Sequence, residues 1–580
     1  MPRRPVAALV ALTIVATLPS LGARAVEAPA AEAVRRGDLA ALKTLVAGGA
    51  DVNAALGDGM TALHWAAERG LVDAATLLLA RGADVTAVTR LGRYTPLHVA
   101  ARRGQAAIVA ALLGAKADPN AVTGTGAVAL HFAAAAGSRE AVAALLDAGA
   151  AVDAREPEWG QTPLMFAAAA GRTEVAQLLV ARGADLAATA KVVDLIARNR
   201  ADAAESRARN QRVAALQRER AAAMATIAGS APPPAPRTAR PADDGNEPEP
   251  LNYAELVAFH GGLTPLLLAV RDGRTATALA LLDAGADLNQ VSAGDRTSPL
   301  LMATINGHFD LARTLLARGA DVRLASEAGA TPLYGVLNMQ WAPKARHPQP
   351  AHYMQQQTGY LELAEAFLKA GADVNARLGK TLWYTTYNRD LLGVDRTGAT
   401  PFWLAAYTLD IPAMRLLLAY GADPNIRTAK VPERYEEGGP DPDAPDQSGM
   451  PPIPWHGPAV APIHAASGVG YGLGFAGNTH RHVPDGWVPA VRFLVEELGA
   501  DVNARDHNGY TPLHHAAARG DNALIHYLVS KGADPTAVAR SGQTTVDMAN
   551  GPVQRVQPFP ETVALLESLG AKNNHRCVSC

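Results

Sequence analysis

A short turn, Gly-Ala-Asp or a close variant, recurs at nearly constant spacing through most of this 580-residue chain. The first residue of the turn stands at positions 49, 82, 116, 149 and 183, in steps of 33, 34, 33 and 34 residues. It stands again at positions 285, 319, 371, 421, 499, 532 and 570, where several steps are longer. A period of this length predicts a solenoid of small stacked units, and it argues against the roughly four globular domains that length alone would suggest.

The sequence between two such turns predicts a pair of short helices. In the unit that begins at Thr61, the threonine is a favourable helix N-cap and Gly70 ends the first helix. The second helix, 72–80, ends at Gly82. Alanines on the first helix let neighbouring helices approach closely. Since one unit cannot bury its own apolar face, we expect the units to stack on one another.

These units resemble the ankyrin repeat. The family signature T-P-L-H-x-A occurs at 95–100 and 511–516, and weaker copies begin at positions 61, 128, 162, 264, 298, 331, 400, 461 and 544. About twelve units cover most of residues 27–572. The resemblance implies an all-α ankyrin-repeat solenoid, in which each unit of about 33 residues adds two helices and a β-hairpin turn. We expect non-enzymatic binding of partner proteins through the concave repeat surface that the first helices and hairpin tips form.

The period is interrupted after the fifth turn, and we expect two stacks, 27–188 and 252–572. The interruption, 189–251, starts as a polar, helix-prone stretch and continues as a Pro-rich linker. Its arginine-rich part, 191–220, has two interpretations. It is a surface-binding arm or, because acidic residues are interspersed among the arginines, a solvated spacer, which we favour.

The first 25 residues predict a secretory signal peptide. Arg3 and Arg4 precede an apolar stretch, 6–18, that is too short to span a bilayer, and 23–25 (Ala-Arg-Ala) fits the small-x-small cleavage rule. We therefore expect an exported protein, periplasmic or secreted, with no membrane span after removal of the signal. The alternative is an uncleaved N-terminal helix.

The charge balance argues against nucleic acid as a partner. Lys and Arg total 53 and Asp and Glu total 55, which gives a net charge of −2. Binding to a phosphate backbone calls for a basic surface instead. We expect a protein partner, whose identity the sequence does not give.

Four insertions enlarge successive units between residues 341 and 487. They follow residue 341, run over 377–399 and about 426–460, and span 468–487. They are rich in Trp and Tyr, which dominate the energetics of protein interfaces. The partner-binding candidates are Trp341, Tyr353, Trp383, Tyr384, Tyr387, Trp403, Trp455, Tyr471 and Trp487. The alternative is that these rings form a small core that holds the long loops in place.

The histidines fall into two groups. Five recur at the repeat period: His64, His98, His131, His464 and His514. The resemblance implies that these are structural and hydrogen-bond the backbone. Within the insertions, His480 and His482 have a spacing that could share a metal, but no Cys and no H-E-x-x-H motif accompanies them. No nucleophile elbow, P-loop or dinucleotide fingerprint occurs in the required context, so we predict no metal, no cofactor and no enzyme activity.

The last residues carry the sharpest chemical signal, a C-x-x-C formed by Cys577 and Cys580, the two cysteines of the chain. Three interpretations compete. The pair closes a local disulfide, exchanges redox equivalents or remains a free tail. It joins His575 in a zinc site. Or it begins the C-x-x-C-H attachment motif of c-type haem, without that motif's histidine. A redox or haem-linked exported protein is therefore the alternative to the binding function.

Overall fold

The computed structural model describes residues 28–228, 249–342, 351–382, 392–432, 445–473, 480–551 and 557–577. The predicted signal peptide, 1–25, lies outside them. Within them nearly all of the regular secondary structure is helical, and the one sheet has two strands. Contacts divide the chain into two compact units, 1–151 and 152–580.

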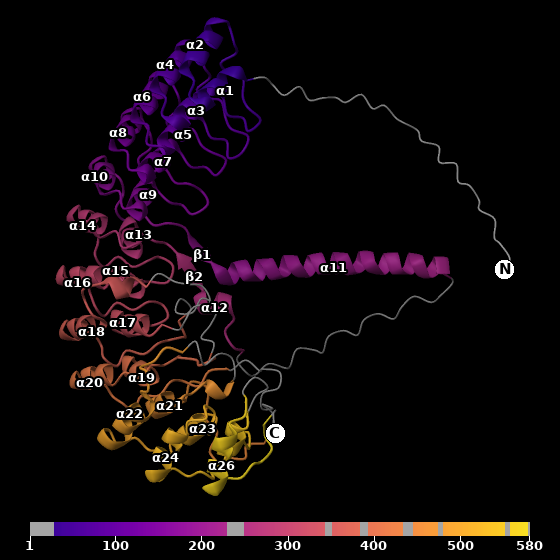
Figure 1. The fold of residues 1–580 in the computed structure, drawn as a ribbon, viewed down its shortest axis with the longest axis vertical. Coiled ribbons are helices and arrows are strands. Elements are labelled where there is room, and N and C mark those ends of the chain that lie inside the picture. Colours follow the sequence, from indigo (N-terminus) through magenta and orange to yellow (C-terminus); the bar gives the residue numbers. More distant parts are fainter. Residues whose placement is uncertain are drawn as a thin grey trace, which may run out of the picture. The chain divides into compact units, whose positions relative to one another are not determined.

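Within each unit, short helices follow one another in pairs (Figure 1). The four pairs of the first unit are α1 (Pro29–Arg36) with α2 (Leu39–Ala47), α3 (Ala62–Arg69) with α4 (Val72–Ala80), α5 (Pro96–Arg102) with α6 (Ala106–Gly114), and α7 (Ala129–Ala136) with α8 (Arg139–Asp147).

The second unit contains eight pairs. They are α9 (Pro163–Ala170) with α10 (Thr173–Ala181), α13 (Pro265–Arg271) with α14 (Thr275–Asp283), α15 (Pro299–Ile305) with α16 (Phe309–Ala317), α17 (Pro332–Gln340) with α18 (Tyr360–Lys369), α19 (Pro401–Tyr407) with α20 (Ile411–Ala419), α21 (Pro462–Ser467) with α22 (Trp487–Arg492) and a π-helical segment (Phe493–Glu497), α23 (Pro512–Ala517) with α24 (Asn522–Ser530), and α25 (Thr545–Ala549) with α26 (Pro560–Ser568). Two 3-10 helices, His352–Gln355 and Tyr471–Leu473, lie in insertions. The predicted all-α repeat architecture is confirmed.

The repeated sequence positions begin and end these helices as expected. At α3 the hydroxyl of Thr61 accepts the backbone N–H of His64 at 3.4 Å, and Gly70 ends the helix with φ 71°, a conformation that a side chain disfavours. Between them, Leu63 and Ala66 are completely buried. The cap therefore fixes where the helix starts, and the apolar face fixes which side packs in the stack.

Asparagines tie several of the turns to the next turn along the chain. The Asn53 side chain accepts from the backbone N–H of Asp84 at 2.7 Å and donates to the carbonyl of Gly82 at 3.3 Å. Asn503 makes the same two bonds to Asp534 and Gly532 at 2.8 and 2.9 Å. One asparagine side chain thus satisfies two backbone groups of the neighbouring turn. These two hydrogen bonds help to set the spacing between successive repeats.

The repeats on either side of the 189–251 interruption stack directly on each other. Helix α9 packs against α13, where Met165 and Leu268 share a buried cluster, and the hydroxyls of Thr173 and Thr277 are 2.8 Å apart. The sequence predicted a boundary between two stacks at this point. The structure instead continues the row of repeats across it, because the apolar faces of α9 and α13 cover each other and the intervening chain leaves from a turn.

The intervening chain begins and ends in a small sheet. Strands β1 (Val192–Asp194) and β2 (Phe259–Gly261) pair antiparallel. Between them lie α11 (Leu195–Ala228) and the short α12 (Tyr253–Val257). Nearly all α11 side chains up to residue 220 are exposed. Among the described residues, no helix combines the length and apolar character that crossing a membrane requires.

Candidate functional site

Three of the periodic histidines, His64, His98 and His464, bond one repeat to the next. The N–H of Thr61 donates to His64 Nδ1 at 3.2 Å, which places the ring proton on Nε2, and Nε2 donates to the carbonyl of Tyr94 at 2.9 Å. His464 makes the corresponding bond to Ala504 at 2.9 Å. Burial lowers the pKa of both rings, that of His464 to about 4. These histidines are neutral structural groups.

Trp403 occupies the histidine position of its own repeat. It lies three residues after the N-cap Thr400, its side chain is completely buried, and its Nε1 donates to the carbonyl of Val460 at 3.0 Å. The indole therefore replaces the histidine bond between repeats. Trp403 is one of the predicted partner-binding residues, and this prediction is wrong, because a side chain inside the stack cannot present its ring to a partner.

The first insertion is anchored by a buried carboxylate. Asp410 accepts hydrogen bonds from Trp341 Nε1 at 2.8 Å, from the Tyr360 hydroxyl at 2.8 Å and from the backbone N–H of Ala413 at 3.0 Å. Burial, followed by the charge of Asp410, raises the pKa of the Tyr360 hydroxyl above its usual value. Trp341, half-buried, thus holds the start of the insertion against the next repeat.

The other end of the insertion contacts a later loop. Arg481 Nη1 donates to the Tyr353 hydroxyl at 2.8 Å, across 128 residues of sequence. Sequence spacing gave no signal of this pairing. It joins the insertion after residue 341 to the one at 468–487.

Rings from the 468–487 insertion pack around His480. The His480 ring lies 4.3 Å from Tyr407, its Nδ1 is 3.2 Å from the Tyr471 hydroxyl, and Trp487 is in edge contact at 5.9 Å. The Arg519 guanidinium lies 3.3 Å from the centre of the Trp487 ring. Burial, with smaller contributions from neighbouring cationic groups, holds the pKa of His480 well below its usual value. A neutral, buried imidazole such as that of His480 is suited to a packing role within the insertion.

The remaining insertion candidates have separate positions. Trp455 is half-buried with the Lys430 ammonium 4.6 Å from its ring centre. Trp383, Tyr384 and Tyr387 lie outside the described residues. In the described part of the chain, no three His, Cys, Asp or Glu side chains gather as metal ligands. The contacts favour the interpretation of a small core holding the loops, which leaves ring edges at the surface.

A cavity of about 80 Å³ lies among the turns of the later repeats. Asp506 and His515 line it, with Oδ2 and Nε2 3.2 Å apart, and Asp506 Oδ1 accepts from the backbone N–H groups of Asn508 and Tyr510 at 2.9 Å. Burial opposes ionisation of Asp506, but the hydrogen bond and charge of His515 outweigh it and hold its pKa well below the usual range. The pair stabilises the turn beside the cavity.

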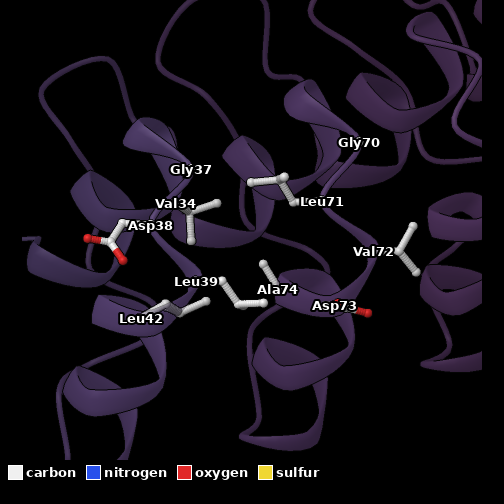
Figure 2. Close-up of a pocket in the computed structure, with 10 residues that line it drawn as sticks. All are labelled: Val34, Gly37, Asp38, Leu39, Leu42, Gly70, Leu71, Val72, Asp73 and Ala74. Atoms are coloured by element: carbon white, nitrogen blue, oxygen red, sulfur yellow. The ribbon is translucent and has the colours of Figure 1, made fainter.

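A larger pocket, of about 290 Å³, opens between the first two helix pairs. Figure 2 shows Val34, Leu39, Leu42, Leu71 and Ala74 gathered around it. The side chains of Leu39 and Leu71 are only half-buried. The pocket thus offers an apolar surface with two carboxylates, Asp38 and Asp73, at its lining.

The most exposed apolar side chains of the first unit lie on its turns. Leu91 is 85% exposed and Val122 is 57% exposed. Their turns touch, since the N–H of Gly124 donates to the carbonyl of Gly92 at 2.7 Å. Solvent-facing apolar groups that adjoin one another in this way are typical of interaction sites.

A second set of exposed apolar side chains lies where α11 leaves the second unit. We call it the root patch, and it comprises Trp159, Val192, Leu251, Tyr253 and Phe259, which are 36–65% exposed. It lies outside the insertions, where the aromatic content of the sequence predicts the binding surface. A partial signal exists, since Trp159, like Leu91, directly precedes a turn glycine.

The C-terminal motif is partly described. Cys577 is disulfide-bonded, and Cys580, the other cysteine of the sequence, lies outside the described residues. A disulfide sulfur is not a thiolate and offers no ligand to a metal.

Models of one repeat family match much of the chain. The ankyrin repeats model of three copies matches residues 30–123, 97–190 and 247–334. The model of many copies matches 480–529, and the single ankyrin repeat model matches 397–429.

Curated relatives match over short regions. Protein phosphatase 1 regulatory subunit 27 of Mus musculus is 39% identical over 69 residues, 12% of this chain and 44% of that protein. ADP-ribosylation factor GTPase-activating protein AGD2 of Arabidopsis thaliana is 39% identical over 61 residues, 10% of this chain and 8% of that protein. The matched regions thus span less than half of either relative. Among solved structures, the human ASB11 ankyrin repeat domain has 25% identity and a TM-score of 0.35, and the match covers 51% of this chain and 99% of that one.

Proposed function

The chain belongs to the ankyrin repeat family, and we propose that it is a non-enzymatic scaffold that binds partner proteins outside the cytoplasm. The binding surfaces would be the turns of the repeats and the insertion loops of 341–487. Four of its relatives are named as regulatory subunits of protein phosphatase 1, a role that involves another protein. Those matches concern the repeats and carry no particular partner over to this chain.

The observation that carries the proposal is the exposure of Leu91 and Val122 on adjoining turns. Burying a leucine or valine side chain away from water is favourable, by about 1.5–3 kcal/mol for full burial. A stable monomer has no need to expose two such side chains on adjoining turns. Arg90 and Arg93 flank Leu91 and supply the polar rim that protein interfaces have around an apolar centre.

The insertion loops add a second, enlarged surface in this proposal. Their rings are anchored by bonds such as Trp341 to Asp410 and Arg481 to Tyr353. Anchored aromatic side chains lose little further entropy when a partner covers their exposed edges. The anchoring bonds therefore support a role for these loops as a preorganised binding surface.

Export is supported by two features. The first 25 residues have the basic, apolar and small-residue parts of a signal peptide. Cys577 is disulfide-bonded, as is usual for proteins of oxidising compartments.

The experiment is affinity capture from the exported fraction with the full chain as bait. The variant carries Leu91→Asp and Val122→Asp, and the control carries Tyr420→Asp, at a residue that is also exposed but lies at the end of α20. The proposal expects specific partners that the control retains and the double variant loses. Identical capture by both variants would overturn the assignment to these turns.

A further inference from the structure

We propose that the root patch and the arginines of α11 together bind an acidic segment of a partner protein that carries apolar side chains. The inference rests on the proposed binding function and gives it a second surface with a stated partner chemistry. It concerns residues 159–259 of the second unit and is independent of Leu91 and Val122.

Exposed apolar side chains are concentrated in this region. Of the thirteen large apolar side chains that are exposed in the described residues, seven lie between Trp159 and Phe259. They include the one exposed tryptophan and the one exposed phenylalanine of that set. Aromatic side chains with arginine beside them are the residue types enriched at interface centres.

The backbone brings the root patch together. The N–H of Lys191 donates to the carbonyl of Trp159 at 2.7 Å, which places that turn beside β1. In the sheet, Val192 pairs with Gly261 and Asp194 pairs with Phe259. Val192 and Phe259 therefore lie diagonally on the same face of the sheet. Tyr253 and Leu251 belong to the segment that leads through α12 into β2.

The arginines of α11 extend outward from the edge of this apolar surface, because the helix begins directly after β1. From residue 195 to 220, α11 carries seven arginines against three acidic residues, a balance of +4 in a chain whose net charge is −2. The ion pair of the described helix is Arg198 with Asp202, at 3.9 Å and exposed. Arg200, Arg207 and Arg209 are exposed. These guanidinium groups can form paired hydrogen bonds with the carboxylates of a partner.

The pattern favours a protein segment over nucleic acid. Acidic side chains, Asp202 and Glu205, lie between the arginines, and a peptide with spaced carboxylates can avoid them, whereas a phosphate backbone is charged at every nucleotide. A polymer that offers only phosphates would also leave the apolar root patch uncovered. An acidic peptide with interspersed apolar residues complements both the arginines of α11 and the apolar root patch.

The test is fluorescence anisotropy with the full chain and a labelled peptide in which glutamate alternates with leucine. A matched peptide has glutamine in place of glutamate, and double-stranded DNA is a third probe. The apolar variant is Trp159→Ser with Phe259→Ser. The charge variant replaces Arg198, Arg200, Arg207 and Arg209 by Gln. The control variant is Leu91→Ser with Val122→Ser.

We expect the glutamate peptide to bind and each root variant to weaken binding about tenfold or more, while the control binds as the parent does. The glutamine peptide should fail to bind. The exposed arginines contribute no packing, so the charge variant remains interpretable if the apolar variant misfolds. Absence of binding, or equal binding by both root variants and the parent, overturns the inference. DNA binding that needs the arginines but not Trp159 overturns it in favour of nucleic acid. Loss of binding in the control alone overturns it while supporting the proposed function at the turns.

Discussion

Trp403 donates its indole N–H to the carbonyl of Val460, 3.0 Å away in the next repeat. His464 does the same for Ala504 at 2.9 Å. Two unlike side chains thus serve one purpose because both place a ring N–H at the same distance from the first-helix backbone. The bond depends on position in the repeat and tolerates a change of residue type.

Trp403→Phe should destabilise the second unit modestly. The ring remains, the Val460 carbonyl keeps its bond from the N–H of Thr428, and loss of one hydrogen bond costs about 1 kcal/mol. Trp403→Ala should cost about 3–5 kcal/mol, because it also opens a cavity. Urea unfolding followed by circular dichroism measures both. Leu216→Ala, on exposed α11, is the control and should change little; equal effects at both positions would contradict the account.

The buried histidines should make stability depend on pH. In the folded chain the pKa of His464 is about 4, against 6.5 for an unperturbed histidine. Between these values the unfolded state binds more protons, so the free energy of unfolding should fall as the pH falls from about 6.5 towards 4. The variant His464→Gln removes one such group. Its free energy of unfolding, measured by urea titration across that range, should vary less steeply with pH than that of the parent; an unchanged slope would exclude His464 as a contributor.

Asp410→Ala should release the insertion after residue 341. Trp341 Nε1, the Tyr360 hydroxyl and the N–H of Ala413 would all lose their acceptor, and each buried donor left unpaired costs about 1–3 kcal/mol. We expect a lower midpoint of thermal unfolding and faster proteolysis near the insertion. Glu174→Ala, at an exposed carboxylate in the first turn of α10, is the matched control. Proteolysis at the same rate in both variants would show that Asp410 does not anchor the loop.

The sequence was sufficient for the helix pairs because every unit repeats the same local code. Thr61, Gly70 and Asn53 each act on neighbours within about one period, so spacing alone locates them. The insertions follow no such code. Arg481 meets Tyr353 only when two loops fold over the stack, and no spacing encodes that closure.

The candidate site was harder to predict than the fold. The aromatic content of the insertions predicts a surface role for Trp403, although its distance from Thr400 matches the histidine position. Leu91 and Trp159 each precede a turn glycine, but the sequence pattern alone does not distinguish them as exposed. Aromatic content pointed to the insertions, but burial decides which rings reach solvent, and burial depends on the packing of the whole unit.

Removal of α11 and α12 should leave the repeats folded. Asp194 and Phe259 are register partners in the sheet, and the N–H of Leu195 donates to the carbonyl of Ala258 at 2.9 Å. The two ends of the segment 195–258, which we call the excursion, therefore already lie together. Replacing 195–258 by Asn-Gly should close a two-residue β-hairpin. Because α9 packs on α13 without help from the excursion, we expect one main unfolding transition, with its midpoint within about 3 °C of the parent. Differential scanning calorimetry measures this. A control that replaces Met165 with Asp attacks the α9–α13 contact itself and should split or strongly lower the transition, since it buries a charge without a partner. If the excision behaved like Met165→Asp, the excursion would be part of what joins these repeats.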